Sequence, residues 1–200
     1  LSEQGISNIN LAIQNTDNLS ELANNLINFQ KEELYSSKVT VSQYELNQYL
    51  RSYLLQFENY AIQNAIALTY QSDFENLDVW IDKNKMDLIT NALKYTPQGG
   101  KVSLKATHNK NTWSLNITDT GIGISRNDQK RLFKYLFRGA NATNQMITGC
   151  GIGMLLTYRL IKNHEGKISF QSTENVGTSF QLCFPIKSNR YVYKSEESVS

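Results

Sequence analysis

Three polar residues, Asn91, Lys94 and Tyr95, lie in the stretch DLITNALKYTPQGG, which ends on a proline and two glycines. If this stretch is helical, positions i, i+3 and i+4 share one face, and Asp87 lies one turn earlier on the same face. An amide oxygen can coordinate a metal ion, an ammonium group can contact a phosphate, and an aromatic ring can cover a planar base. A solvated helix face would show the same residues, so the strip alone leaves both interpretations open.

A second motif, DTGIGI, follows an alternating strand pattern and places Asp119 just before Gly121 and Gly123. A carboxylate there can accept a hydrogen bond from an exocyclic amine such as that of adenine. The glycines allow a flat ring to approach the backbone. A plain glycine turn between a strand and a helix would look the same, so this motif is also weak when taken alone.

A third motif, TGCGIGM, places Gly149, Gly151 and Gly153 before a strong helical pattern. Glycines at a helix start expose backbone N–H groups where the helix dipole favours anions, which is a phosphate-binding arrangement. The motif is neither a Walker sequence nor a dinucleotide fingerprint, because the required glycine and lysine spacings are absent. The order and spacing of the three motifs together are more specific than any one of them.

Together with RLFKYLFRG and GTSFQLCFP, these motifs resemble the N, first glycine, F and second glycine boxes of sensor histidine kinases. The resemblance covers about Val39 to Ile186 and is closest to hybrid two-component sensors. It implies a two-layer α/β sandwich of the histidine kinase ATPase type that binds ATP and Mg²⁺. It also implies an ATP-dependent kinase that phosphorylates a histidine, for relay to an aspartate of a response regulator.

The resemblance assigns roles at the matching positions. Asn91 would bind Mg²⁺, Lys94 would contact a phosphate and Tyr95 would line the nucleotide cavity. Asp119 would recognise the adenine amine, supported through water by Thr178. The other predicted nucleotide-binding residues belong to the glycine and F boxes: Gly121, Gly123, Ile124, Phe133, Phe137, Arg138, Gly149, Gly151, Ile152, Gly153 and Met154, the last standing where the family usually has leucine. Residues 140–148 would form a mobile ATP lid.

The sequence departs from the family pattern at its histidines. His108 falls in a predicted hairpin and His164 at a predicted helix end, and neither lies in a phosphoacceptor motif. We therefore expect both to be structural and the phosphoacceptor histidine to lie outside this chain.

The N box is the second departure, because it is about five residues short, which at 3.6 residues per turn would rotate the upstream part of the helix. Either the helix is truly shortened, or residues are missing between about Met86 and Thr90. In a shortened helix, Asp87 would resemble the water-activating acid of hydrolysing relatives. A weak ATPase, and a degenerate nucleotide-binding or scaffold module without phosphotransfer, therefore remain as alternative functions.

The elements that position these motifs follow from the hydrophobic pattern. Residues 1–36 are predicted to be the second helix of a dimerisation and phosphotransfer bundle, with a narrow Ile and Leu seam that needs a partner such as a second copy. Residues 39–187 are predicted to form the ATP-binding domain, and 188–200 a polar tail or linker. Within the domain, Ser42 and Glu45 are expected to cap a helix that continues through Ile62.

Further along the chain, we expect a strand at 78–81 and a hairpin over 101–119. Ser125 and Asp128 are expected to cap a short helix ending near Phe137. A helix that Gly166 stops and a second hairpin over 167–186 follow.

The composition of the chain argues against several classes of binding partner. The 200 residues carry a formal net charge of +2, so no global basic field suggests nucleic acid or an anionic membrane surface. No apolar run approaches the roughly 18 residues of a membrane span, and we expect a soluble, cytoplasmic part of a membrane-anchored sensor. Cys150 and Cys183 lack zinc-site spacing and are expected to be reduced thiols.

Overall fold

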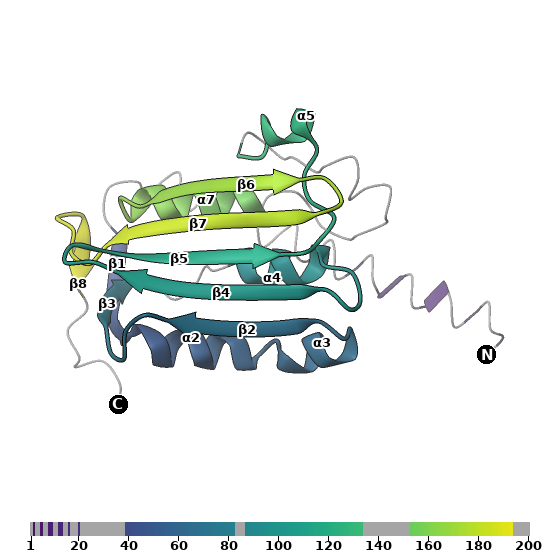
Figure 1. Ribbon diagram of the computed structural model, residues 1–200, viewed down its shortest axis with the longest axis horizontal. Coiled ribbons are helices and arrows are strands. Elements are labelled where there is room, and N and C mark those ends of the chain that lie inside the picture. The colour runs from purple at the N-terminus through teal and green to yellow at the C-terminus, as the bar shows by residue number, and fades with distance from the viewer. Residues whose placement is uncertain are drawn as a thin grey trace.

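The computed structural model describes residues 39–82, 87–133 and 153–193, with isolated positions between Ser2 and Ser20. A five-stranded sheet forms one layer. The helices α2 (Leu46–Leu55), α3 (Glu58–Gln63), α4 (Asp87–Tyr95) and α7 (Gly153–Asn163) lie on one face of it (Figure 1). The predicted two-layer α/β fold is confirmed.

The large sheet has the order β2-β4-β5-β7-β6. Its two antiparallel hairpins are β4 (Lys101–His108) with β5 (Thr112–Asp119), and β6 (Lys167–Thr173) with β7 (Gly177–Pro185). Both hairpins were predicted from their alternating pattern, and β5 and β7 pair antiparallel at the centre. The edge strand β2 (Ala67–Ser72) pairs parallel with β4 and was not predicted, because its residues are half-buried or exposed and give little contrast between faces.

A smaller sheet has the order β3-β1-β8 and contains β3 (Asp78–Ile81), β1 (Val39–Glu45) and β8 (Tyr191–Tyr193). The strand β8 pairs parallel with β1, and the Tyr191 hydroxyl donates to the backbone oxygen of His164 at 3.3 Å. The polar tail predicted from residue 188 therefore begins too early. A three-residue strand held by backbone pairing leaves no local pattern that sequence reasoning could detect.

The start of α2 also differs from the prediction. Ser42 lies within β1, and Glu45 is the residue that caps the helix, accepting N–H groups of Asn47 at 3.0 Å and Gln48 at 2.6 Å. The capping box assigned to Ser42 and Glu45 is therefore wrong. The single helix expected to continue through Ile62 is divided into α2 and α3, and no proline or glycine marks the break in the sequence.

The core lies between the helices and the large sheet, where Leu50, Leu93 and Trp113 are buried. Burying such a side chain contributes roughly 1.5–3 kcal/mol. The apolar stripe of α4, formed by Leu88, Ile89, Ala92 and Leu93, faces this core. Because that stripe is fixed against the core, the polar residues of α4 lie toward the other side of the helix.

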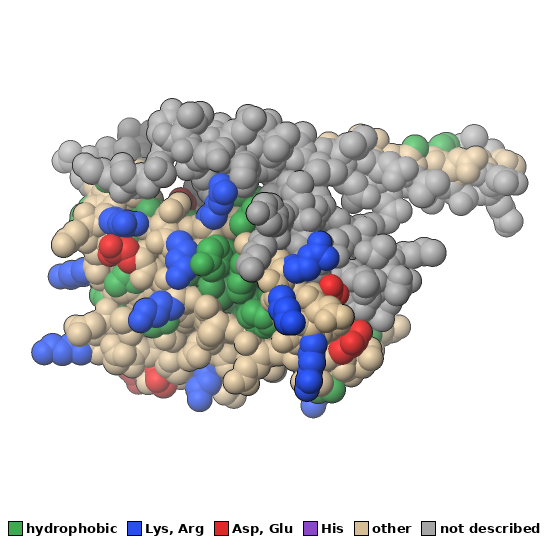
Figure 2. Space-filling view, turned by 90° about the horizontal axis from the view of Figure 1, so that it is seen from above, with side chains coloured by type: hydrophobic (Ala, Val, Ile, Leu, Met, Phe, Trp, Pro, Cys, Tyr) green, Lys and Arg blue, Asp and Glu red, His purple; other side chains and the backbone are tan. Residues whose placement is uncertain are grey.

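The N-terminal segment is described only at isolated positions. Those from Gly5 to Ser20 are helical, and Ile9 and Ile13 are 45% and 55% exposed. The rest of the predicted 6–33 helix lies outside the described residues. No helix among the described residues is long and apolar enough to span a membrane. On the face that Figure 2 shows, Lys and Arg side chains lie singly around a group of apolar side chains.

Candidate functional site

The helix α4 carries the predicted metal and phosphate ligands. It is continuous from Asp87 through Thr90 to Tyr95, and Asn91, Lys94 and Tyr95 are half-buried. No chain break therefore falls between Asp87 and Thr90, while residues 83–86 and the side chain of Asp87 lie outside the described part. The hydrolytic role considered for Asp87 stays a prediction.

The end of α4 is joined to the glycine motif through the backbone. The N–H of Ile122 donates to the Tyr95 carbonyl oxygen at 3.1 Å. A Cβ atom on Gly121 would lie only 2.4 Å from the same oxygen. Only glycine permits this approach, so the loop after Asp119 is held directly against the helix that bears Asn91.

Asp119 is the last residue of β5 and is 7% exposed. Its Oδ1 accepts the N–H of Gly121 at 2.8 Å and the N–H of Thr178 at 3.1 Å. Desolvation by burial raises the pKa of this carboxyl, and the two backbone hydrogen bonds oppose that rise. Both bonds go to Oδ1, so Oδ2 has capacity to accept a hydrogen bond from a ligand.

Gly123 lies against the β6–β7 hairpin. Its φ is +62°, and an added Cβ would lie 2.0 Å from the Thr173 carbonyl oxygen. Beside it, the Ile122 carbonyl accepts the N–H of Asn175 at 2.7 Å. The hairpin turn therefore forms the back of the glycine loop and fixes its distance from the sheet.

Thr178 is 6% exposed and contributes to this wall in two ways. Its N–H holds Asp119, and its hydroxyl shares a hydrogen bond of 2.9 Å with the Ser172 hydroxyl. The predicted support of adenine through water stays a prediction. Ser172 itself, and Gln129 in α5 (Arg126–Gln129), were missed from the sequence, because an isolated polar residue in a strand or short helix carries no motif.

The F box and the start of α7 are described in part. Phe133 stacks on Tyr158 of α7 with centroids 5.0 Å apart. Met154 packs against the core, and Gly153 begins α7 with no atom within 4 Å of an added Cβ. The other predicted site residues lie outside the described part, as does the predicted lid: Phe137, Arg138, Gly149, Gly151 and Ile152.

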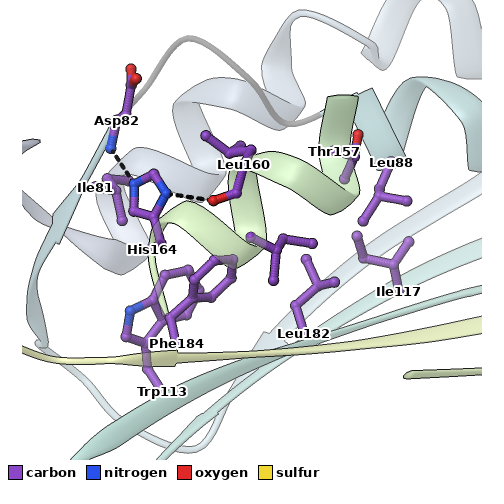
Figure 3. A pocket seen from close by; sticks show the side chains of 11 residues that line it. Ile81, Asp82, Leu88, Trp113, Ile117, Thr157, Leu160, His164, Leu182 and Phe184 are labelled. Atoms are coloured by element: carbon purple, nitrogen blue, oxygen red, sulfur yellow. Dashed lines mark hydrogen bonds between the residues drawn. The ribbon is translucent and has the colours of Figure 1, made fainter. Parts of the chain in front are cut away.

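An apolar pocket beneath α7 is a separate feature, and none of the predicted nucleotide-binding residues lines it (Figure 3). At its side, His164 is 2% exposed; its Nε2 accepts the N–H of Asp82 at 3.3 Å, and its Nδ1 lies 2.9 Å from the Leu160 carbonyl oxygen. Both ring nitrogens are thus engaged in a neutral tautomer, which leaves no nucleophilic lone pair. The structural role predicted for His164 is confirmed. His108 lies at the exposed end of β4, as expected.

Comparisons with known proteins agree with this geometry. A family model described as histidine kinase-, DNA gyrase B-, and HSP90-like ATPase matches residues 86–188, just over half of the chain. Histidine kinase P4 of Formosa agariphila is 28% identical over 185 residues, which cover 88% of this chain and 14% of P4. The chain thus spans only a small part of such curated relatives.

Two solved structures share the fold. Full-length ShkA in complex with AMPPNP superposes with a TM-score of 0.77 at 18% identity, covering 95% of this chain and 40% of ShkA. ThkA in complex with the response regulator TrrA superposes with a TM-score of 0.65 at 22% identity, covering 94% of this chain and 53% of ThkA. The resemblance drawn from the sequence motifs is confirmed.

Proposed function

Because the chain belongs to the family of histidine kinase-, DNA gyrase B- and HSP90-like ATPases, we propose that it is the ATP-binding catalytic domain of a sensor histidine kinase. It transfers the γ-phosphate of ATP to a histidine outside this chain. The observation that carries the proposal is the buried carboxylate of Asp119, held by two backbone N–H groups on one oxygen only.

Adenine recognition is the first role in this proposal. The Oδ2 atom of Asp119 accepts a hydrogen bond from the exocyclic amine of adenine. Gly121 and Gly123 allow the adenine ring to lie against the backbone. The N–H groups of Gly121 and Thr178 already hold Asp119 Oδ1 before any ligand arrives, so recognition needs no rearrangement of the carboxylate. A base without an amine at that position would leave a buried acceptor unpaired, which costs affinity.

The polar strip of α4 supplies the second role. Asn91 would hold Mg²⁺ through its amide oxygen and Lys94 would contact a phosphate. The amide oxygen of Asn91 fits this ion, because Mg²⁺ is a hard cation that takes oxygen ligands and completes its shell with substrate phosphates and water. Bound there, Mg²⁺ would neutralise charge on the phosphates.

Partners of the whole protein follow from the same proposal. A receiver domain of a response regulator is the acceptor in the relay. ThkA has been solved in complex with a response regulator protein, TrrA. The N-terminal helix pairs with a second copy, since Ile9 and Ile13 expose apolar side chains one turn apart. The domain acts in the cytoplasm.

The test is to mix the chain with Mg-ATP and a separately made phosphoacceptor helix pair. Acid-labile phosphohistidine should form on the helix pair, and Asp119→Asn should strongly reduce its formation at limiting ATP, while Ser179→Ala should not. ATP binding without any transfer would favour the scaffold alternative. Steady ATP hydrolysis that Asp87→Asn removes would favour the weak ATPase.

A further inference from the structure

We propose that Ser172 and Gln129 are positioning residues for adenine recognition. They lock the backbone of Ile124 to the β6–β7 hairpin and thereby hold the wall that carries Asp119 in its binding geometry. This inference rests on the proposed function, because it concerns how the same site discriminates between bases.

The Ser172 hydroxyl uses its full hydrogen-bonding capacity at the junction of two loops. It accepts the N–H of Ile124 at 2.8 Å and donates to the Gly177 carbonyl oxygen at 3.1 Å. It also shares a hydrogen bond of 2.9 Å with the Thr178 hydroxyl, for which it has one remaining lone pair. One side chain thus connects the end of the glycine loop with both residues at the start of β7.

Gln129 also holds the backbone of Ile124, through the carbonyl group. Its Nε2 donates to the carbonyl oxygen of Ile124 at 2.8 Å and to that of Ser172 at 2.9 Å. The backbone N–H of Ile124 is therefore held by one side chain and its carbonyl by another. Ile124 itself lies outside the helices and strands, so these two side chains supply the order there that secondary structure does not.

The connection from Ser172 continues to Asp119 through Thr178 of the hairpin. Thr178, whose hydroxyl meets Ser172, donates its N–H to Asp119 Oδ1 at 3.1 Å. A Cβ added to Gly177 would lie 2.1 Å from the Asp119 carbonyl oxygen, so the hairpin backbone passes directly over Asp119. With the chain from Gly121 to Ile124, these hydrogen bonds close a ring through Asp119, Ser172 and Thr178. The β5–β7 pairing holds the backbone of Asp119, and the ring through Ser172 helps to orient its side chain.

The ring of hydrogen bonds should therefore affect how strongly the site prefers adenine over guanine. If the ring opens at Ser172, the glycine loop keeps the bond from the Asn175 N–H to the Ile122 carbonyl oxygen but loses its link at Ile124, and Asp119 Oδ2 is held less firmly opposite the adenine amine. Binding through phosphate contacts on α4 and α7 would remain. The loss should therefore appear as a smaller preference for ATP over GTP.

The experiment measures dissociation constants of Mg-ATP and Mg-GTP by titration calorimetry for the wild-type chain, Ser172→Ala, Gln129→Glu and Ser179→Ala. Gln129→Glu keeps the size of the side chain and replaces the donor with a carboxylate that faces two carbonyl oxygens. Ser179→Ala is the matched control: Ser179 lies in the same hairpin and is equally half-buried, but its hydroxyl bonds Thr118 and Asn116. The ratio of the two constants is unaffected by the folded fraction, so a purely destabilised variant keeps the wild-type ratio.

We expect the preference for ATP to fall by about tenfold in Ser172→Ala and Gln129→Glu, as for a buried polar group left unpaired. Ser179→Ala should keep the wild-type ratio. A wild-type chain that discriminates while Ser172→Ala and Gln129→Glu keep the full ratio would overturn the positioning role alone. A wild-type chain that binds no ATP would overturn the proposed function itself.

Discussion

The adenine wall and the polar strip of α4 belong to one candidate site but are held in different ways. The wall, formed by Asp119 to Ile124 and Ser172 to Thr178, is fixed by hydrogen bonds between segments far apart in the sequence. The strip, formed by Asn91, Lys94 and Tyr95, depends on the burial of the opposite face of its own helix.

This contrast indicates a division of labour. Discrimination between bases needs a carboxylate whose position is fixed before the ligand arrives. A misplaced acceptor would not bind adenine more tightly than another base. Contacts with phosphates and a metal ion tolerate side chains that settle when the ligand binds. The wall should therefore respond sharply to small changes, and the strip more gradually.

The largest effect is expected at Asp119. In Asp119→Asn an amide group faces two backbone N–H groups and the adenine amine, so at least one donor must meet another donor. We expect ATP to bind about 10- to 100-fold more weakly, as when a charged hydrogen-bond partner is removed. Calorimetry measures this, with Ser179→Ala as the folded control. Unchanged affinity would show that the wall does not bind adenine.

Two glycines, Gly123 in the wall and Gly153 at the start of α7, should differ in how much their replacement changes the free energy of unfolding. Gly123→Ala places a Cβ 2.0 Å from a carbonyl oxygen at a φ of +62°. Its free energy of unfolding should fall by about 1–3 kcal/mol. Gly153→Ala meets open space in the first turn of α7 and should be neutral or stabilising by up to about 1 kcal/mol. Denaturant unfolding compares the two, and equal losses would contradict the difference in packing.

Removing Mg²⁺ tests whether Asn91 in the strip is the metal ligand. Chelating Mg²⁺ with EDTA should weaken ATP binding by about tenfold in the wild-type chain and much less in Asn91→Ala, as expected for one lost metal contact. Calorimetry with and without EDTA checks this. If Asn91→Ala keeps the full dependence on Mg²⁺, then Asn91 is not the metal ligand.

Lowering the pH should produce the smallest effect of the four. It should weaken ATP binding, whereas the contribution of Asp119 to the stability of the fold should increase. Burial raises the pKa of the Asp119 carboxyl, so ATP affinity should decline as the pH falls toward that raised pKa and the carboxylate is protonated. The folded state holds this proton more tightly than the unfolded chain does. The contribution of Asp119 to stability is therefore present in acid and is lost as the pH rises through its folded pKa.

The measurement is calorimetric affinity and thermal unfolding of the wild-type chain and Asp119→Asn over about pH 4 to 7, a range that begins near the ordinary aspartate pKa. Since Asp119→Asn cannot titrate at this position, the difference between the two curves isolates the carboxyl from the titration of ATP itself. Parallel affinity curves would contradict the raised pKa at the binding wall.

The sequence allowed the candidate residues of both regions to be located wherever residue type carries the signal. Asp119 with its glycines, the α4 strip and the capping of α5 by Ser125, whose hydroxyl accepts the N–H of Asp128, were all recognisable locally. The contacts that hold the wall were not. Ser172 meets Ile124 from 48 residues away, and a serine in an alternating strand gives no sign of such a partner.

The same reason explains the errors in the fold. The strand β8 depends on pairing with β1 at the other end of the chain, and Glu45 caps α2 while also accepting the N–H of Leu77 at 3.2 Å. Ser42 is paired with β3 inside the strand β1, so the helix begins only after Glu45, and this pairing exists only in the tertiary structure. Local patterns predicted elements and motifs, whereas long-range partners decided how they are fixed.

A crystal structure of the chain with Mg²⁺ and AMPPNP tests the central claim most directly. The account predicts the adenine amine within hydrogen-bond distance of Asp119 Oδ2, with the Asp119 to Ile124 loop unmoved and Mg²⁺ on the Asn91 amide oxygen. An adenine ring bound away from Asp119, or a glycine loop rebuilt on binding, would contradict it.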